Sequence, residues 1–300
     1  MDQIVTSVDT VRDAPHDPKG LWPVDWLTLA YLAAAGVLVL VGWRRLPDAG
    51  WLLALHAGGA ALLVGAARSP ASRLVRIFRH WYPLPYVIAC YKEMSLLIPV
   101  LRGVDFDPQM VRLDYAIWGV HPNLWLEHWQ RPLLTETLQI LYSLFVPAIM
   151  LVACLLWRQR RRAEFRYYAF LLALGFLVSY VGYFLVPVRG PRFLLSSLQR
   201  VPLVGLFSFG ALRRTLDVME SAHYDCFPSG HVELTIIACW SSRMISSVLF
   251  RIFFAYTLCV GFATVYLRYH YTVDVMAGAL VAAALLAIAP RLYAALERGC

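Results

Sequence analysis

Apolar residues along the chain gather into eight long stretches, which short polar or charged segments separate. A helix needs about 20 mostly apolar residues to cross a bilayer, and four of the stretches meet this condition without a charged residue. These four are residues 26–43, 49–67, 137–157 and 167–188. Each is therefore predicted to be a transmembrane helix.

Four further apolar stretches are shorter or are interrupted by charged residues. The adjacent Lys92 and Glu93 interrupt one of them, either as part of a re-entrant segment or substrate wall, or by pairing with other spans. The four stretches are residues 81–101, 231–250, 252–267 and 275–290. With them we expect about eight transmembrane helices, which predicts an all-α fold, a polytopic integral membrane bundle.

The composition excludes a soluble domain of this length. Hydrophobic residues make up 60% and charged residues 15% of the 300 residues, whereas soluble domains contain about 45–50% apolar and about 25% charged residues. The net charge of +8 suits nucleic acid, anionic lipid or a phosphorylated substrate. In a membrane protein the last two apply, so we expect the bilayer and a lipid phosphate or phospholipid as partners, and no nucleic acid.

Arginine residues are concentrated in four segments that the span count places on one side of the membrane. These segments contain thirteen Arg, including the run from Arg158 to Arg166. Because cytoplasmic segments are rich in Lys and Arg, we expect this side to be cytoplasmic. The polar N-terminal tail (residues 1–23) and the C-terminal tail (residues 291–300) lie on it. The long connection at residues 189–230 is then extracytoplasmic.

The strongest chemical signal ends this outer connection. The segment Asp-Cys-Phe-Pro-Ser-Gly-His occupies residues 225–231, directly before an apolar helix. Ser229 suits the N-cap position, and the free backbone N–H groups at a helix start, such as that of Gly230, bind anions. His231 falls on the first turn of the helix. The segment therefore predicts an anion site with an imidazole beside it.

Two further segments reach the same face of the membrane. His270 and Asp274 share a helix face because they are four residues apart. A carboxylate on one imidazole nitrogen leaves the other free as a nucleophile or base. The outer connection also contains Arg189 and Arg192 within Pro-Val-Arg-Gly-Pro-Arg; a phosphate site explains these cations, and so does a solvated loop with spare charge. Together the side chains provide a nucleophile, an acid and guanidinium clamps for phosphoryl transfer.

Phe-Pro-Ser-Gly-His followed by His-x-x-x-Asp resembles the type 2 phosphatidic acid phosphatase superfamily, a family of membrane lipid phosphatases and phosphotransferases. The resemblance covers roughly residues 81–290 and implies a six-helix catalytic core there. Residues 24–80 would then be an accessory transmembrane pair with a basic loop. The resemblance implies that the second histidine attacks phosphorus, an aspartate orients it, the first histidine protonates the leaving oxygen, and Ser-Gly holds phosphate oxygens. In this sequence those residues are His270, Asp274, His231, Ser229 and Gly230.

The motifs depart from the usual family pattern at two places. The first motif usually reads Lys-x6-Arg-Pro, but Leu185 and Gly182 stand seven residues before the two arginines. The Gly-Pro-Arg form is more similar to the inositolphosphotransferase branch, which includes inositol phosphorylceramide synthases. The third motif usually has Ser-Arg where this chain has Ala263 and Thr264. Arg268 is the candidate to replace that guanidinium, beside Arg189 and Arg192 as phosphate-binding residues.

These features predict an enzyme that acts on a lipid phosphate or phosphodiester through a phosphohistidine. Transfer to a lipid alcohol acceptor makes it an inositolphosphotransferase-like enzyme; water as sole acceptor makes it a phosphatase of lipid phosphates or polyprenyl diphosphates. No cofactor and no metal are expected. A metal held by His231, His270 and Asp274 is the alternative, which nearby Arg disfavours by repelling a cation. A different class is a non-catalytic protein that binds or transports lipid anions, but such a protein needs no paired histidines.

The second outer connection, at residues 102–132, is rich in carboxylate and aromatic side chains. It suits a cap that binds a headgroup, because carboxylates accept hydrogen bonds from sugar hydroxyls, but a solvated interfacial loop is the interpretation that the composition favours. The residues concerned are Asp105, Asp107, Asp114, Trp118, His121 and Trp125.

Overall fold

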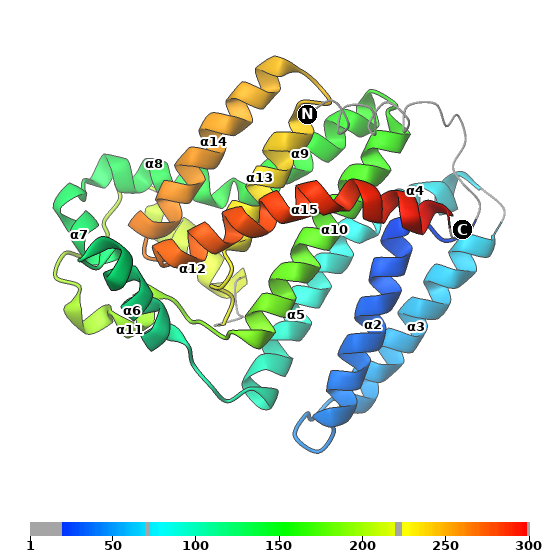
Figure 1. The fold of residues 1–300 in the computed structure, drawn as a ribbon, viewed down its shortest axis with the longest axis horizontal. Coiled ribbons are helices and arrows are strands. Elements are labelled where there is room, and N and C mark those ends of the chain that lie inside the picture. Colours follow the sequence, from blue (N-terminus) through cyan, green and yellow to red (C-terminus); the bar gives the residue numbers. More distant parts are fainter. Residues whose placement is uncertain (1–19, 70–71, 220–223, 299–300) are drawn as a thin grey trace. The chain divides into compact units, whose positions relative to one another are not determined.

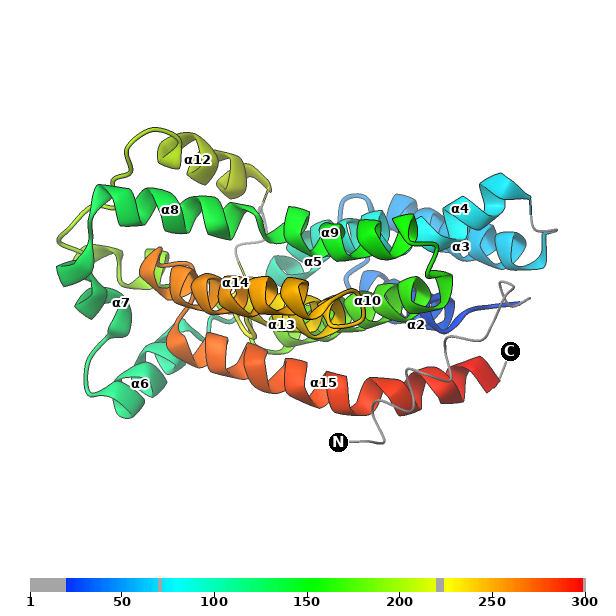
Figure 2. The ribbon, with the colours of Figure 1, turned by 90° about the horizontal axis from the view of Figure 1, so that it is seen from above.

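The computed structural model describes residues 20–69, 72–219 and 224–298, and most of these are helical (Figures 1 and 2). The predicted all-α class is confirmed; within the described residues β-type pairing of the backbone is limited to an isolated bridge between Val188 and Asp225. The predicted N-terminal tail lies almost entirely outside the described residues. The predicted C-terminal tail continues the last helix as far as Arg298.

The first half of the chain contains α2 (Pro23–Val41), α3 (Ala49–Arg68), α4 (Arg73–Trp81), α5 (Pro83–Leu101), α6 (Asp107–Trp118), α7 (Pro122–Trp125), η1 (Leu126–Trp129), α8 (Pro132–Ser143) and α9 (Phe145–Arg158). The second half contains α10 (Arg162–Leu185), α11 (Pro191–Leu194), η2 (Ser196–Leu198), α12 (Phe209–Met219), α13 (Gly230–Ser242), α14 (Ser247–Tyr266) and α15 (Thr272–Arg298).

The chain has the helices of a multi-pass membrane protein. The helices α2, α3, α5, α10, α14 and α15 are long and apolar enough to cross a bilayer. The pair α8 and α9, bent by 44° at its junction, adds a seventh span if it is counted as one. Each of these seven corresponds to a predicted span.

The eighth predicted span, residues 231–250, differs from the expectation. Its helix α13 has 13 residues and ends at Ser242, and α14 begins at Ser247, where the Ser246 hydroxyl accepts a hydrogen bond from the Leu249 amide at 3.1 Å. Apolar residues of α13 such as Ile237 are buried within the protein. A helix of this length with an apolar sequence is typically a core helix, so burial in protein explains the composition that suggested a span.

The helices form two compact units. Unit 1 contains the described residues up to Leu101, Ala153–Leu177 and those from Ala284 onward. Near its first helix, Arg79 stacks on Trp22 at 4.0 Å and pairs with the buried Asp25 at 2.8 Å. A charge pair at a helix end thus holds the start of α2 against α4.

Unit 1 also contains a polar triad between three predicted spans. Glu93 of α5 accepts a hydrogen bond from the Tyr31 hydroxyl of α2 at 2.9 Å, and its other oxygen lies 2.7 Å from Nε2 of His56 on α3. Of the alternatives for Glu93, pairing with other spans is therefore the one observed. The triad links α2, α3 and α5.

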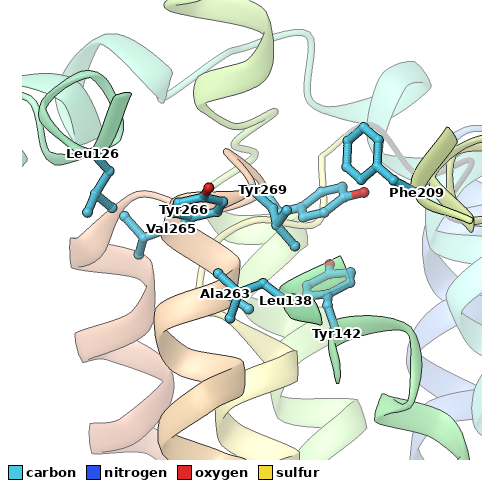
Figure 3. Close-up of a cluster of buried hydrophobic side chains, with 9 residues drawn as sticks. Leu126, Leu138, Tyr142, Phe209, Ala263, Val265, Tyr266 and Tyr269 are labelled. Atoms are coloured by element: carbon cyan, nitrogen blue, oxygen red, sulfur yellow. The ribbon is translucent and has the colours of Figure 1, made fainter. Parts of the chain in front are cut away.

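Unit 2 comprises Arg102–Val152 and Val178–Ala283 and holds every predicted site residue. Within it, α13 packs against α14, and α8 packs against both α12 and α14. The buried cluster in Figure 3 joins α8, α12 and α14 where α14 ends, just before His270. Its members are Leu126, Leu138, Tyr142, Phe209, Ala263, Val265, Tyr266, Leu267 and Tyr269. The cluster fixes the start of the segment that carries the second histidine.

Candidate active site

Three segments far apart in the sequence meet around Gly190. The Cys226 amide donates to the Val188 carbonyl at 3.2 Å, and the Cys226 thiol donates to the Tyr269 carbonyl at 3.1 Å. Gly190 has φ +103°, and a Cβ there would lie 2.7 Å from the Cys226 sulfur and 2.8 Å from the Tyr269 oxygen. Only glycine suits both the backbone conformation and the space. The predicted convergence of the three segments is therefore what the structure shows.

Asp107 holds two of these segments from α6. Its carboxylate accepts hydrogen bonds from the Arg189 amide at 2.6 Å, the Gly190 amide at 2.8 Å and the Tyr271 hydroxyl at 2.7 Å. Burial and a hydrogen bond with Asp105 raise the pKa of Asp107 to about 7. Asp107 thus positions backbone on both sides of the site.

Asp114 and Asn123 support the segment that contains His270. Asp114 accepts from the Thr272 hydroxyl at 2.7 Å and from the Thr272 and Val273 amides at 3.0 and 2.9 Å, so it satisfies donors at the start of α15. The Asn123 side chain donates to the carbonyls of Val265 and His270 at 2.9 and 3.0 Å.

Both interpretations of residues 102–132 need correction at these positions. Asp107 and Asp114 are each only 1% exposed and are saturated by the protein's own donors. They are therefore unlike a solvated loop and offer no open carboxylate to a headgroup. A sequence pattern gives no sign of this role, because the partners are mostly backbone amides more than 80 residues away.

The hydrogen bonds of His270 define which nitrogen is free. Its Nδ1 lies 3.0 Å from the Cys226 carbonyl oxygen, which only accepts, so Nδ1 carries a proton, and in the neutral imidazole Nε2 carries the lone pair. Oδ2 of Asp274 lies 3.6 Å from Nδ1 and accepts from the Tyr271 amide at 2.9 Å. The Cys226 carbonyl therefore shares the orienting role that the sequence assigned to Asp274 alone.

His231 lies on the first turn of α13, as predicted, and belongs to an aromatic stack. Its ring stacks on Tyr142 with centroids 4.3 Å apart, and Tyr142 stacks in turn on Tyr269 at 4.4 Å. The Tyr142 hydroxyl lies 3.4 Å from Nδ1 of His231. The rings of His231 and His270 are 5.9 Å apart. The two imidazoles are thus close enough to approach opposite sides of one small group.

Ser229 is the N-cap residue of α13, but its side chain differs from the prediction. The hydroxyl makes no cap hydrogen bond, and within the described residues this fully buried oxygen has no partner. The Ser229 amide donates to the Asp274 carbonyl at 3.0 Å, which ties α13 to α15. A buried hydroxyl without a partner costs free energy, so it is available for a ligand oxygen beside the amides of the first turn, including that of Gly230.

The three predicted arginines have different surroundings. Arg192 pairs with Asp217 at 2.7 Å and lies over the Tyr269 ring at 5.2 Å. Arg189 stacks on Phe193 at 4.6 Å. Arg192 therefore lies beside the residue that precedes His270, whereas the contacts of Arg189 place only its backbone at the junction.

Arg268 is bound into a network of its own. Its φ is +66°, and its guanidinium donates to the Glu127 carboxylate at 2.8 Å, the Gln199 side chain at 3.0 Å and the Val201 carbonyl at 2.6 Å. These contacts join the segment at residues 102–132 to the segment at residues 189–230. They use the guanidinium for structure, and a phosphate-binding role of Arg268 stays a prediction.

Cys226, His270 and Asp274 form a group among the described residues whose ligand atoms lie within 4.8 Å of one another. Metals bind the thiolate form of cysteine. Burial raises the pKa of the Cys226 thiol, which donates its proton to the Tyr269 carbonyl. The donor set therefore fits a neutral hydrogen-bonded network better than a metal centre.

Two imidazoles that meet edge to face at 5.9 Å, one of them on the first turn of a helix, are the groups that phosphoryl transfer through a histidine needs. Comparison with protein families gives a match to the PAP2 superfamily over residues 108–288, more than half of the chain. The chain belongs to the PAP2 superfamily. The resemblance seen in the sequence is confirmed at this level, and the inositolphosphotransferase branch stays a prediction. No curated protein and no solved structure matches the chain.

Membership of the PAP2 superfamily indicates the general type of reaction. PAP2 proteins are in general metal-independent phosphatases with a histidine nucleophile, and they act on lipid phosphates. The matched region includes His231, His270 and Asp274. The general class of enzyme is thereby supported, and its substrate and acceptor belong to the proposal below.

Proposed function

We propose that the protein transfers a phosphoryl group from a lipid phosphate or phosphodiester through a phosphohistidine on His270. The observation that carries the proposal is the state of His270: Nδ1 is tied to the Cys226 carbonyl, and Nε2 keeps its lone pair 5.9 Å, ring to ring, from His231. A nucleophile needs this free nitrogen, and a leaving oxygen needs a proton donor on the other side.

The reaction follows in two balanced steps. Burial and the neighbouring His270 lower the pKa of His231, so the negative charge of the bound phosphate is what keeps His231 protonated. Nε2 of His270 forms a bond to phosphorus, the bond from phosphorus to the lipid oxygen breaks, and the protonated His231 gives its proton to that oxygen. His231 then takes a proton from the acceptor hydroxyl, whose oxygen displaces His270 and restores its lone pair. Ser229, Gly230 and Arg192 bind the phosphate oxygens, with Arg189 and Arg268 as further candidates, and Asp274 with the Cys226 carbonyl orients His270.

The acceptor distinguishes two outcomes of the same site. Water gives a lipid phosphatase, and the hydroxyl of a second lipid gives a phosphotransferase. The Gly-Pro-Arg segment, with Arg192 beside Tyr269, supports the inositolphosphotransferase-like alternative by its similarity to that branch. The proposed site lies on the extracytoplasmic side, with the arginine-rich segments in the cytoplasm.

The test uses purified protein in detergent with EDTA and measures phosphate and lipid products together. Phosphatidate, polyprenyl diphosphate and phosphatidylinositol are offered, each with and without ceramide or diacylglycerol. We expect His270→Ala to lose turnover by about 10⁴-fold or more. His128→Ala, which changes an exposed histidine on η1, should keep wild-type turnover.

A trapped intermediate gives a second readout. Brief reaction with a radiolabelled lipid phosphate should give an acid-labile, alkali-stable phosphoryl adduct in the wild type and none in His270→Ala. Turnover that persists in His270→Ala would refute the nucleophile. Anion binding without turnover of any substrate would favour the binding or transport class instead.

A further inference from the structure

Arg213 of α12 reaches the same aromatic ring as Arg192. The Cζ atom of Arg213 lies 5.8 Å from the centroid of the Tyr269 ring, and that of Arg192 lies 5.2 Å from it. Guanidinium groups stack on aromatic faces, and Tyr269 is a fixed platform because it stacks on Tyr142 and donates its hydroxyl to Gln139 at 3.3 Å. The residue after this platform is His270.

The charges around this platform are unbalanced. Arg192 has a carboxylate partner in Asp217, four residues after Arg213 on α12, and Arg268 has one in Glu127. Within the described part of the chain, Arg213 has no carboxylate partner of its own. Burial lowers the pKa of Arg268, the carboxylate of Glu127 raises it, and the positive charge of Arg213 lowers it. Cations gathered in this way favour the binding of an anion.

We propose that Arg213 is a second phosphate-binding residue, which clamps the substrate phosphate together with Arg192. This inference rests on the proposed function and assigns α12 a part in the site. Asp217 supports it, because its 47% exposed carboxylate makes the 2.7 Å contact with Arg192 that a phosphate oxygen would make. An arriving phosphate exchanges with this carboxylate and gains both guanidiniums at once.

The neighbouring Arg214 provides a matched control. It has the same charge and lies on the same helix, but it is exposed. If the charge of the outer connection acted only as a general field, the two residues would contribute alike. A specific clamp predicts that phosphate affinity depends on Arg213 and not on Arg214.

The experiment measures the binding of inorganic phosphate by the full-length protein in detergent, from the rise in unfolding temperature with phosphate concentration. The phosphate titration is made both in the wild type and in His270→Ala, because phosphate binding requires no turnover. We expect Arg213→Gln to raise the dissociation constant for phosphate by about 10-fold or more, and Arg214→Gln to change it less than 2-fold. Arg213→Met, a second uncharged variant, decides the matter if Arg213→Gln is not recovered as a folded protein.

The outcomes separate this inference from the proposed function. Wild-type phosphate affinity in an uncharged Arg213 variant, or an equal loss in Arg214→Gln, overturns the role of Arg213. Turnover that survives in His270→Ala overturns the nucleophile but leaves the phosphate titration valid. A selective loss of phosphate affinity at Arg213 supports the clamp in either case.

Discussion

Single residues of the 102–132 connection act on the site through the backbone. Asp107 binds the amides of Arg189 and Gly190, and Asp114 binds those of Thr272 and Val273. Loop backbone at a site needs such partners, because buried N–H groups without an acceptor are costly. The positions of the phosphate-side arginines and of His270 therefore depend on side chains that make no contact with a reacting atom.

Burial of Asp107, together with its hydrogen bond with Asp105, makes the stability of the fold depend on pH. The folded protein holds the Asp107 proton up to a pKa of about 7, whereas an unfolded chain releases it near 3.8. Between these values the folded state binds more protons, so stability falls as the pH rises from about 4 to about 7 and this contribution is constant above. Asp105→Asn keeps an acceptor for the Asp107 amide but removes the charge, so it should make the decline shallower.

Unfolding temperatures of the detergent-solubilised protein at several pH values between 5 and 8 measure this effect. Asp48→Asn, at a residue outside unit 2, controls for the change in net charge. A wild-type decline that is the same in Asp105→Asn would contradict the pairing of Asp105 with Asp107.

The residues proposed to react or to bind anions could be identified from the sequence, and the residues that hold them in place largely could not. His231, His270 and Asp274 follow from short motifs with fixed spacing, and the structure brings the two imidazoles together. The Cys226 carbonyl and the Asp107 carboxylate escape such reasoning. A carbonyl has no sequence signature, and the Asp107 contact to Tyr271 spans 164 residues.

At the scale of helices, local composition identified six helices that can span a membrane and a seventh span if the bent pair α8 and α9 is counted as one, and it misjudged α13. Hydropathy does not distinguish an apolar side chain that faces lipid from one that faces protein. Ile237 and Ala238 are fully buried in unit 2, so the 13-residue α13 needs no membrane to explain its sequence. Local sequence also cannot reveal the partners of Glu93, because they lie on two other helices.

The triad of Tyr31, His56 and Glu93 should stabilise the packing of α2, α3 and α5. Interhelical hydrogen bonds in membrane proteins are worth about 0.6 kcal/mol on average, so Tyr31→Phe should lower the free energy of unfolding by about that amount. Glu93→Leu should cost more, because it removes both the acceptor of the 2.9 Å hydrogen bond from Tyr31 and the carboxylate 2.7 Å from Nε2 of His56.

Thermal unfolding in detergent compares these variants with Lys92→Leu, which replaces the adjacent exposed charge on α5. The expected order of destabilisation is Glu93→Leu, then Tyr31→Phe, then Lys92→Leu. Equal stability of Glu93→Leu and Lys92→Leu would show that the triad does not hold the three helices together.

For the molecule as a whole, the distribution of arginines predicts which side of the membrane the site faces. Four segments contain thirteen arginines and alternate along the chain with the outer connections. The charge rule predicts that these four segments are cytoplasmic. The outer connection at residues 189–230 breaks this rule with five arginines of its own. Arg192 and Arg213 both lie over Tyr269, so a bound phosphate would account for cations on the side where the charge rule disfavours them.

Cysteine labelling tests this orientation directly. Phe207 is 92% exposed in the outer connection, and Arg160 is exposed in the turn between α9 and α10. A membrane-impermeant maleimide should label Phe207→Cys on intact cells and Arg160→Cys only after lysis, each measured above the labelling of the wild-type cysteines. The opposite pattern would place the site in the cytoplasm, and the arginines at residues 158–166 would then contradict the charge rule. Both introduced cysteines are accessible to the maleimide after lysis. Labelling of both in lysed cells therefore shows that a cysteine unlabelled on intact cells is on the other side of the membrane and is not unreactive.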